Sequence, residues 1–219
     1  MLLTLAGALD VPLRERNDLL LAGGFAPVYH ETNLADPSMA PARQALDRIL
    51  RHQEPFPAVV MDRRWNILLA NDAASRFFAQ FIDAAAEGTL NVLKLMFDPA
   101  KVRPFVRNWE SVAEALIQRL HRETVGGVVD EGTAQLLEEL LRYPDVPQQW
   151  RDVDLSAAPS PLLPIEFQKD GVTMRYFSTV TTLGTPRDIT LQELRIECFF
   201  PADAETEALA IARSESINA

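Results

Sequence analysis

Two short apolar runs, 58–62 and 65–70, are separated only by Arg63 and Arg64, and this pair of runs constrains the fold more than any other feature. Apolar runs joined by so short a turn predict an antiparallel hairpin. Similar runs return late in the chain, where we predict three further strands, at residues 164–169, 172–183 and 189–200. The chain is therefore expected to build an antiparallel sheet whose second and third strands are separated by a long insertion.

The insertion carries helical patterns. Asn71 or Asp72 is expected to cap a first helix, and a second short helix is predicted to begin near Asn91. The clearest helix is predicted over 101–123, where apolar residues recur at three-and-four spacing. Two more helices are predicted, over 131–142 inside the insertion and over 41–52 ahead of the hairpin.

Composition divides the chain into four parts. Residues 1–24 are predicted to form two short helices, the second of them capped by Asp10. Residues 25–40 are rich in proline and turn-forming residues, which indicates a linker. The main domain is expected to span 41–200, and residues 201–219, rich in alanine and glutamate, are expected to form a flexible tail.

Five antiparallel strands with helices inserted after the second strand form the layout of a PAS-like domain. We therefore expect an α+β fold with a PAS-like five-stranded antiparallel sheet, preceded by a short helical N-terminal remnant. The inserted helices would cover one face of the sheet. The space between helices and sheet could then hold a ligand, because binding pockets are concave, mostly apolar and carry few polar groups.

The charge of the chain limits its partners. It has 31 acidic and 21 basic side chains and a formal net charge of -10, so a broad nucleic-acid-binding face is not expected. A single cysteine excludes an internal disulfide and suits a reducing compartment. We find no apolar run of about 18 residues and no signal-peptide pattern, and we expect a cytoplasmic protein without membrane contact.

The sequence offers no evident carrier of catalysis. It has no G-x-S-x-G motif and no glycine-rich nucleotide loop, and Cys198 in mid-strand is expected to be a buried structural thiol. The three histidines, His30, His52 and His121, lack the spacing of metal ligands. We therefore predict no enzyme, no metal and no resident cofactor. Haem is a weaker alternative that would require His121 to turn inward.

Several segments carry a family resemblance: WNILLAN at 65–71 with the helix after it, LMFDP at 95–99, NWE at 108–110, and LGTP at 183–186 before the last strand. Together they resemble the MmyB-like ligand-binding domain, over about residues 40–200. That domain follows an XRE-type helix-turn-helix in many bacterial transcription regulators. The resemblance implies a small apolar ligand, for which a fatty acid is a plausible candidate, and DNA binding through the attached helix-turn-helix.

The opening residues are similar to the last helices of such a helix-turn-helix module, whose recognition helix would precede Met1. This chain alone is therefore expected not to bind DNA specifically. Regulators of this kind read two half-sites, so a homodimer is expected.

The cavity implied by the resemblance would lie between the long helix and the sheet. We expect Phe77, Leu93, Met174, Leu194 and Cys198 to contribute to its walls. Arg107 and Arg175 are candidates for binding a carboxylate head group, with Asn71 and Asn108 as further donors. The predicted ligand-binding residues are Trp65, Ile67, Leu69, Phe78, Phe81, Phe97, Val106, Arg107, Trp109, Ala113, Leu116, Arg175, Tyr176 and Ile196.

Plainer roles compete with these assignments. An apolar stripe is more often ordinary core, the arginines could lie at the surface, and Asn71 could serve only as a helix cap. Two other functions also stay open: a closely packed dimerisation module without ligand, and an enzyme acting on acyl chains. A cavity would favour the ligand-binding interpretation, and a polar cluster converging on the cavity would favour the enzyme.

Overall fold

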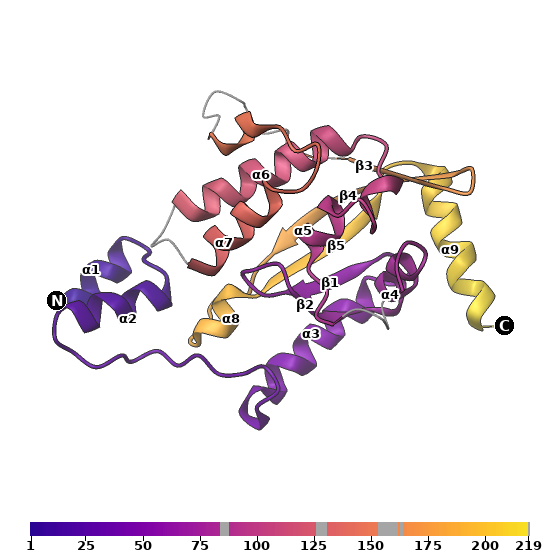
Figure 1. The fold of residues 1–219 in the computed structure, drawn as a ribbon. Coiled ribbons are helices and arrows are strands. Elements are labelled where there is room, and N and C mark those ends of the chain that lie inside the picture. The colour runs from indigo at the N-terminus through magenta and orange to yellow at the C-terminus, as the bar shows by residue number, and fades with distance from the viewer. Residues whose placement is uncertain (84–87, 126–130, 153–161, 163, 219) are drawn as a thin grey trace.

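The computed structural model describes residues 1–83, 88–125, 131–152, 162 and 164–218. Its centre is a five-stranded antiparallel sheet with the strand order β2-β1-β5-β4-β3 (Figure 1). The strands are β1 (Ala58–Met61), β2 (Ile67–Ala70), β3 (Ile165–Lys169), β4 (Val172–Thr181) and β5 (Arg195–Pro201). With helices inserted after the second strand, this is the α+β fold predicted from the sequence.

The inserted helices cover one face of the sheet. They are α4 (Asp72–Ala79), α5 (Val92–Phe97), α6 (Trp109–Val125) and α7 (Glu131–Leu140), together with short 3-10 turns at Arg103–Phe105 and Gln148–Arg151. Their apolar side chains and one face of the sheet form a single large hydrophobic cluster. We call the space between these helices and the sheet the interior.

Helix α3 (Ala40–His52) covers the other face of the sheet. Leu46 and Leu50 of α3 pack there against Ala58 and Val60 of β1 in a smaller cluster. Ala45 and Ile49, the apolar neighbours of these two residues in the sequence, are exposed, so the buried stripe of α3 is narrow. The sheet is thus covered on both faces at β1 and β5, and these two strands carry buried side chains on both sides.

A bulge in the hairpin decides which residues of β2 face the interior. Val60 pairs with Leu69, whereas the next residue, Met61, pairs with Ile67, so β2 carries one extra residue. Val60 and Met61 are neighbours in a strand and point to opposite faces. Leu69 therefore follows Val60 towards α3, and Ile67 follows Met61 into the interior.

The long helix of the insertion is shorter than predicted. Residues before Trp109 form turns, because Pro104 removes a backbone N–H and the chain then pairs briefly with β3. The N–H of Arg107 donates to the carbonyl of Glu166 at 2.8 Å, and Val106 forms an isolated bridge with Phe167. This segment is an additional edge partner of β3, where helix was expected.

The last predicted strand also begins later. Residues Ile189–Glu193 form a short helix, α8, which Asp188 caps by accepting from the N–H of Thr190 at 2.9 Å. The strand β5 starts only at Arg195. Residues 153–161 and 163, which precede β3, lie outside the described residues.

The expected flexible tail is a helix, α9 (Ala204–Asn218). Asp203 caps it by accepting from the N–H of Thr206 at 2.8 Å. The hydroxyl of Thr206 in turn accepts from the N–H of Arg175 at 2.9 Å, which attaches α9 to β4. The end of the chain therefore belongs to the folded domain.

The N-terminal part forms two helices, α1 (Leu2–Ala8) and α2 (Leu13–Ala22), joined to α3 by an extended segment (Figure 1). Asp10 does not cap α2, because its backbone lies at φ +50° in the turn before Pro12. These helices lie at the end of the molecule opposite α9. None of the described helices is long and apolar enough to cross a membrane.

Candidate ligand-binding site

Phe77 of α4 is the centre of an aromatic cluster at one end of the interior. Its ring meets Phe167 edge-on with centroids 4.9 Å apart, and meets Tyr176 in the same way at 5.6 Å. Phe81 lies at 5.2 Å and Phe199 at 6.4 Å from the same ring. Edge-to-face contacts of this kind stabilise the folded state by more than the burial of their apolar area alone. This end of the interior is therefore a closely packed apolar wall.

Ten of the fourteen predicted ligand-binding residues lie in the interior, buried in its cluster or packed against it. They are Trp65, Ile67, Phe78, Phe81, Phe97, Val106, Trp109, Ala113, Leu116 and Tyr176. The structure therefore brings most of the predicted site together on one face of the sheet. Their contact with a ligand stays a prediction.

Two predicted residues, Leu69 and Ile196, belong to the opposite face. Ile196 pairs with Val60, and both pack in the cluster under α3, where Leu69 joins them. Leu194 and Cys198, expected on the cavity floor, lie in this same cluster. The assignment of these residues to the cavity is wrong, because the bulge and the register of β5 turn them away from the inserted helices.

The two arginines proposed for a head group lie at the surface. Arg107 is exposed and donates to Gln168 Oε1 at 2.9 Å. Arg175 forms an ion pair with Asp203 at 3.0 Å, and Glu166 lies at 3.6 Å from its guanidinium. Both side chains connect surface elements, and neither is part of the interior.

Other expected donors have structural partners. Asn71 caps α4 through the N–H of Ala74, and Asn108 donates to the carbonyl of Pro164 and accepts from the N–H of Glu166. The indole of Trp109 donates to the carbonyl of Met96 at 2.8 Å. These side chains hold the backbone of the site in place, and their hydrogen bonds are already made to backbone groups.

A polar end of the interior is built around Glu197 of β5. Glu197 pairs with Val59, which lies in the interior cluster, so its carboxyl group points between sheet and helices. Its side chain is 6% exposed. Oε1 accepts from the hydroxyl of Ser178 at 2.6 Å, whereas Oε2 is buried and has no hydrogen-bond partner among the described residues.

The surroundings of Glu197 shift its acidity. Burial raises the pKa of this carboxyl group, and the hydrogen bond from Ser178 and the positive charge of Arg119 oppose the shift. Arg119 comes from α6, on the opposite wall of the interior. Its guanidinium lies 4.6 Å from the ring centre of Trp65, and that of Arg195 lies 5.4 Å from the same ring. Two cations thus lie against one buried indole, and the charge of one of them, Arg119, acts on Glu197.

Near this polar end, part of the sheet edge has no strand partner among the described residues. Strand β3 pairs with β4 only as far as Tyr176. Beyond that point, β4 has β5 as its only strand partner among the described residues, and Ser178 lies on this stretch. The polar end therefore lies close to a stretch of β4 whose outer edge has no strand partner in the part of the chain that the structure describes.

Sequence reasoning missed Glu197. In β5, one alternating set is Ile196, Cys198 and Phe200, and the other is Arg195, Glu197 and Phe199. The first set is the more apolar, so it was assigned to the cavity. The charged residues in the second set were the available signal, because a carboxylate in a strand buried on both faces needs a reason other than packing.

The described residues outline three clefts outside the interior, and Glu197 lines none of them. One of about 470 Å³ lies on α3 beside Arg48, Arg51 and His52. A pocket of about 30 Å³ lies beside Phe77, between α4 and α9. A cleft of about 380 Å³ lies where α2 meets the hairpin turn and α8. Its charged lining consists of Arg14, Glu31, Asp62, Arg63, Arg64 and Glu193.

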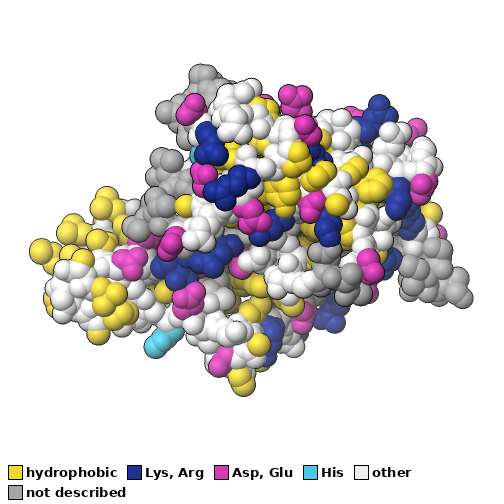
Figure 2. Space-filling view, in the orientation of Figure 1, with side chains coloured by type: hydrophobic (Ala, Val, Ile, Leu, Met, Phe, Trp, Pro, Cys, Tyr) yellow, Lys and Arg dark blue, Asp and Glu magenta, His cyan; other side chains and the backbone are white. Residues whose placement is uncertain are grey.

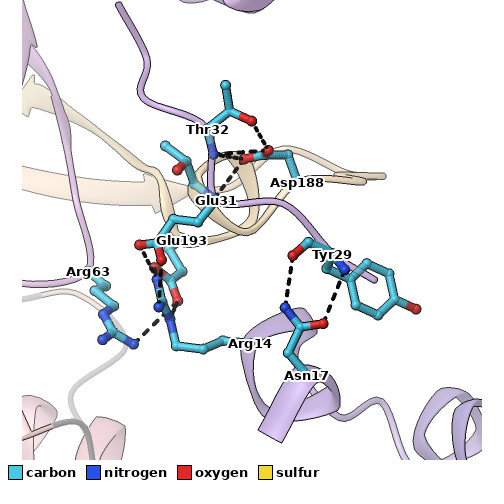
Figure 3. A network of polar contacts seen from close by, with 9 residues as sticks. Arg14, Asn17, Tyr29, Glu31, Thr32, Arg63, Asp188 and Glu193 are labelled. Carbon is cyan, nitrogen blue, oxygen red and sulfur yellow. Dashed lines mark hydrogen bonds and ion pairs between the residues drawn. The ribbon is translucent and has the colours of Figure 1, made fainter. Parts of the chain in front are cut away.

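An ion-pair network at the cleft beside α2 and α8 joins the N-terminal helices to the sheet domain (Figure 3). Arg14 of α2 contacts Glu193 of α8 at 2.7 Å and Glu31 of the linker at 2.5 Å. Arg63 of the hairpin turn contacts Glu193 from the other side at 3.3 Å. These hydrogen bonds to carboxylates raise the pKa of Arg14 well above its usual range, so it stays charged.

The outer surface of the N-terminal helices is apolar, as the hydrophobic atoms gathered there in Figure 2 show. Leu5, Leu9, Leu21 and Phe25 are all more than half exposed. Contiguous apolar surface of this kind marks interaction sites. In the part of the chain that the structure describes, no group of three or more metal-ligating side chains comes together.

The strand order, the inserted helices and the interior with one aromatic and one polar end define a PAS-like domain. Residues 42–212 match the family described as the MmyB-like transcription regulator ligand binding domain. The chain belongs to this family, as its sequence motifs predicted. No curated protein matches the chain.

Solved PAS domains are among the similar structures. The PAS domain of BvgS from Bordetella pertussis is 16% identical, with a TM-score of 0.35, covering 81% of this chain and 99% of that one. The PAS domain of an HTR-like protein from Haloarcula marismortui is 9% identical, with a TM-score of 0.30, covering 74% and 97%. An RNA-binding light-oxygen-voltage receptor is 12% identical, with a TM-score of 0.34, covering 93% and 48%.

Proposed function

We infer that this chain is the ligand-sensing part of a cytoplasmic bacterial transcription regulator, and that it acts by binding and not by catalysis. The ligand is a small apolar molecule, such as a fatty acid, held in the interior between the sheet and the inserted helices. The match to a ligand-binding domain family over residues 42–212 carries this proposal. DNA binding belongs to a helix-turn-helix attached to α1 and α2, and the regulator is a homodimer.

The junction network supports a route from ligand to DNA. Glu193, which holds Arg14 of α2, precedes Glu197 by one short stretch of β5. Arg63, which holds the same Glu193, is two residues from Trp65 at the polar end of the interior. If the polar end has two arrangements and the ligand binds one of them more tightly, ligand binding would shift the protein towards that arrangement. The position of α2 would change with it.

Native mass spectrometry of the purified chain, followed by solvent extraction, tests the proposal. We expect a discrete adduct whose released mass corresponds to an apolar small molecule. A ligand-free mass, with no thermal shift on adding decanoic acid or decanol, would contradict it. That result would favour a closely packed dimerisation module, a function to which the aromatic packing around Phe77 is also suited.

A further inference from the structure

We propose that Glu197 selects the head group of the ligand, and that the interior takes an apolar chain bearing a hydroxyl group. This inference rests on the proposed function and narrows its ligand class: the head group at the same site is a hydroxyl group and not the carboxylate of a fatty acid. The proposal stands on the free Oε2 atom of Glu197, its buried position and the arrangement of its neighbours.

The position of Glu197 has no explanation in packing. Val59 and Phe199 lie next to it on the same face of the sheet and are apolar core residues. A buried polar atom without a partner costs stability, whereas an apolar side chain of similar size would fit this face without that cost. An unpaired atom of this kind in a native interior points to a partner such as a ligand or an ordered water.

The chemistry of Oε2 favours a hydroxyl group. A hydroxyl group both donates and accepts, so it pairs with a carboxyl group whether that group is ionised or protonated. A ligand carboxylate only accepts, so it can bond to Oε2 only when Glu197 is protonated. Beside an ionised Glu197 it would add a second negative charge to the one that Arg119 already offsets. Burial raises the pKa of Glu197 and so favours its protonated state more than water does, and a hydroxyl group pairs with that state as well as with the ionised one.

The neighbours of Glu197 fix the direction of binding. Ser178 holds Oε1 from β4, which leaves Oε2 as the atom available to a ligand. Phe199 continues the same strand face towards the aromatic cluster of Phe77 and Tyr176. We place the hydroxyl group at Glu197 and the apolar chain along this face.

Three probes with the same chain length test the head group: decanol, chlorodecane and decanoic acid. Trp65, Trp109 and Trp150 are all in or against the interior, so their fluorescence reports binding to the full chain. We expect the wild type to bind decanol about tenfold more tightly than chlorodecane, the effect of one hydrogen bond to a buried group. It should also bind decanol more tightly than decanoic acid.

Substitutions assign the effect to Glu197. Glu197→Leu should bind decanol and chlorodecane alike, and Glu197→Gln should keep the preference for decanol, because an amide also donates and accepts. Glu207→Leu, a change of the same kind at an exposed site on α9, should behave like the wild type. A melting curve of each variant confirms that it is folded.

The outcomes separate the two proposals. Three outcomes would overturn the role of Glu197 and leave ligand binding intact. They are equal binding of decanol and chlorodecane by the wild type, a preference for decanol that persists in Glu197→Leu, and tightest binding of decanoic acid. A wild type that binds none of the probes and carries no adduct in native mass spectrometry overturns both.

Discussion

Glu197 should make the ligand-free protein less stable than its fold allows. Its Oε2 atom is buried without a partner among the described residues, and such a group costs about 1–3 kcal/mol. We expect Glu197→Leu to raise the free energy of unfolding by a similar amount, measured by urea denaturation without ligand. Ser178, which loses its partner in this variant, is only half-buried and can bond to water. A variant less stable than the wild type would contradict the prediction.

The same residue gives a pH dependence with a defined sign. The folded-state pKa of Glu197 is raised above its ordinary value of 4.5, so between these two values the folded state binds a proton that the unfolded state has lost. Stability should therefore fall as the pH rises from 4.5 to the folded-state pKa. Over this pH range, the urea concentration at the unfolding midpoint should fall more for the wild type than for Glu197→Gln. Parallel curves would show that Glu197 titrates normally.

At the scale of elements, α9 depends on its cap. Asp203 accepts from the N–H of Thr206 and also pairs with Arg175 of β4. We expect Asp203→Ala to cost about 1 kcal/mol of stability, and Asp203→Ser to recover most of the loss because serine also caps helices. Thermal denaturation of the three proteins measures the effect. Equal losses in both variants would instead assign the stabilisation to the ion pair with Arg175.

The sequence predicted elements well where one residue type fixes a local structure. Asn71 and Asn91 both cap helices where expected, since their side-chain oxygens accept from backbone N–H groups three residues later. Pro104 lacks a backbone N–H, which disfavours a helix interior at this position. It therefore indicates that the helix predicted from residue 101 starts later. Docking of α9 depends on Thr206 reaching the backbone of a distant strand, which no local pattern reveals.

The faces of the strands were harder to predict than the strands themselves. Alternation places Ile67 and Leu69 on one face, and only the extra residue in β2 separates them. In β5 both alternating sets are largely buried, because helices cover both faces of the sheet. Hydrophobicity alone does not show which set faces the interior. The sequence therefore predicts the aromatic residues of the interior but not Glu197 at its polar end.

At the scale of the whole molecule, polar contacts near α8 hold the N-terminal helices and the linker. The hydroxyl of Thr32 in the linker donates to Asp188 at 2.7 Å, and the N–H of Ile189 donates to the carbonyl of His30 at 2.8 Å. Arg14 pairs with Glu193 and Glu31, and the N–H of Leu13 donates to Gln192 of α8 at 2.6 Å. Because Arg14 and Glu193 are each largely shielded from water, their pair should be less screened by salt than an exposed pair. The linker between α2 and α3 is otherwise extended, so the junction is expected to open locally before the sheet domain unfolds.

This arrangement predicts that Arg14→Ala releases α1 and α2 without unfolding the sheet domain. Limited proteolysis should cut between residues 23 and 36 several-fold faster than in the wild type, while the main thermal transition stays in place. Arg48→Ala, an exposed arginine on α3, is the matched control and should leave the cutting rate unchanged. Equal rates in the two variants would show that Arg14 does not hold the junction. A ligand shifts only an equilibrium whose two states it binds with different affinity. If the ligand acts on this junction, adding it must change the cutting rate of the wild type. Its effect on Arg14→Ala should be smaller.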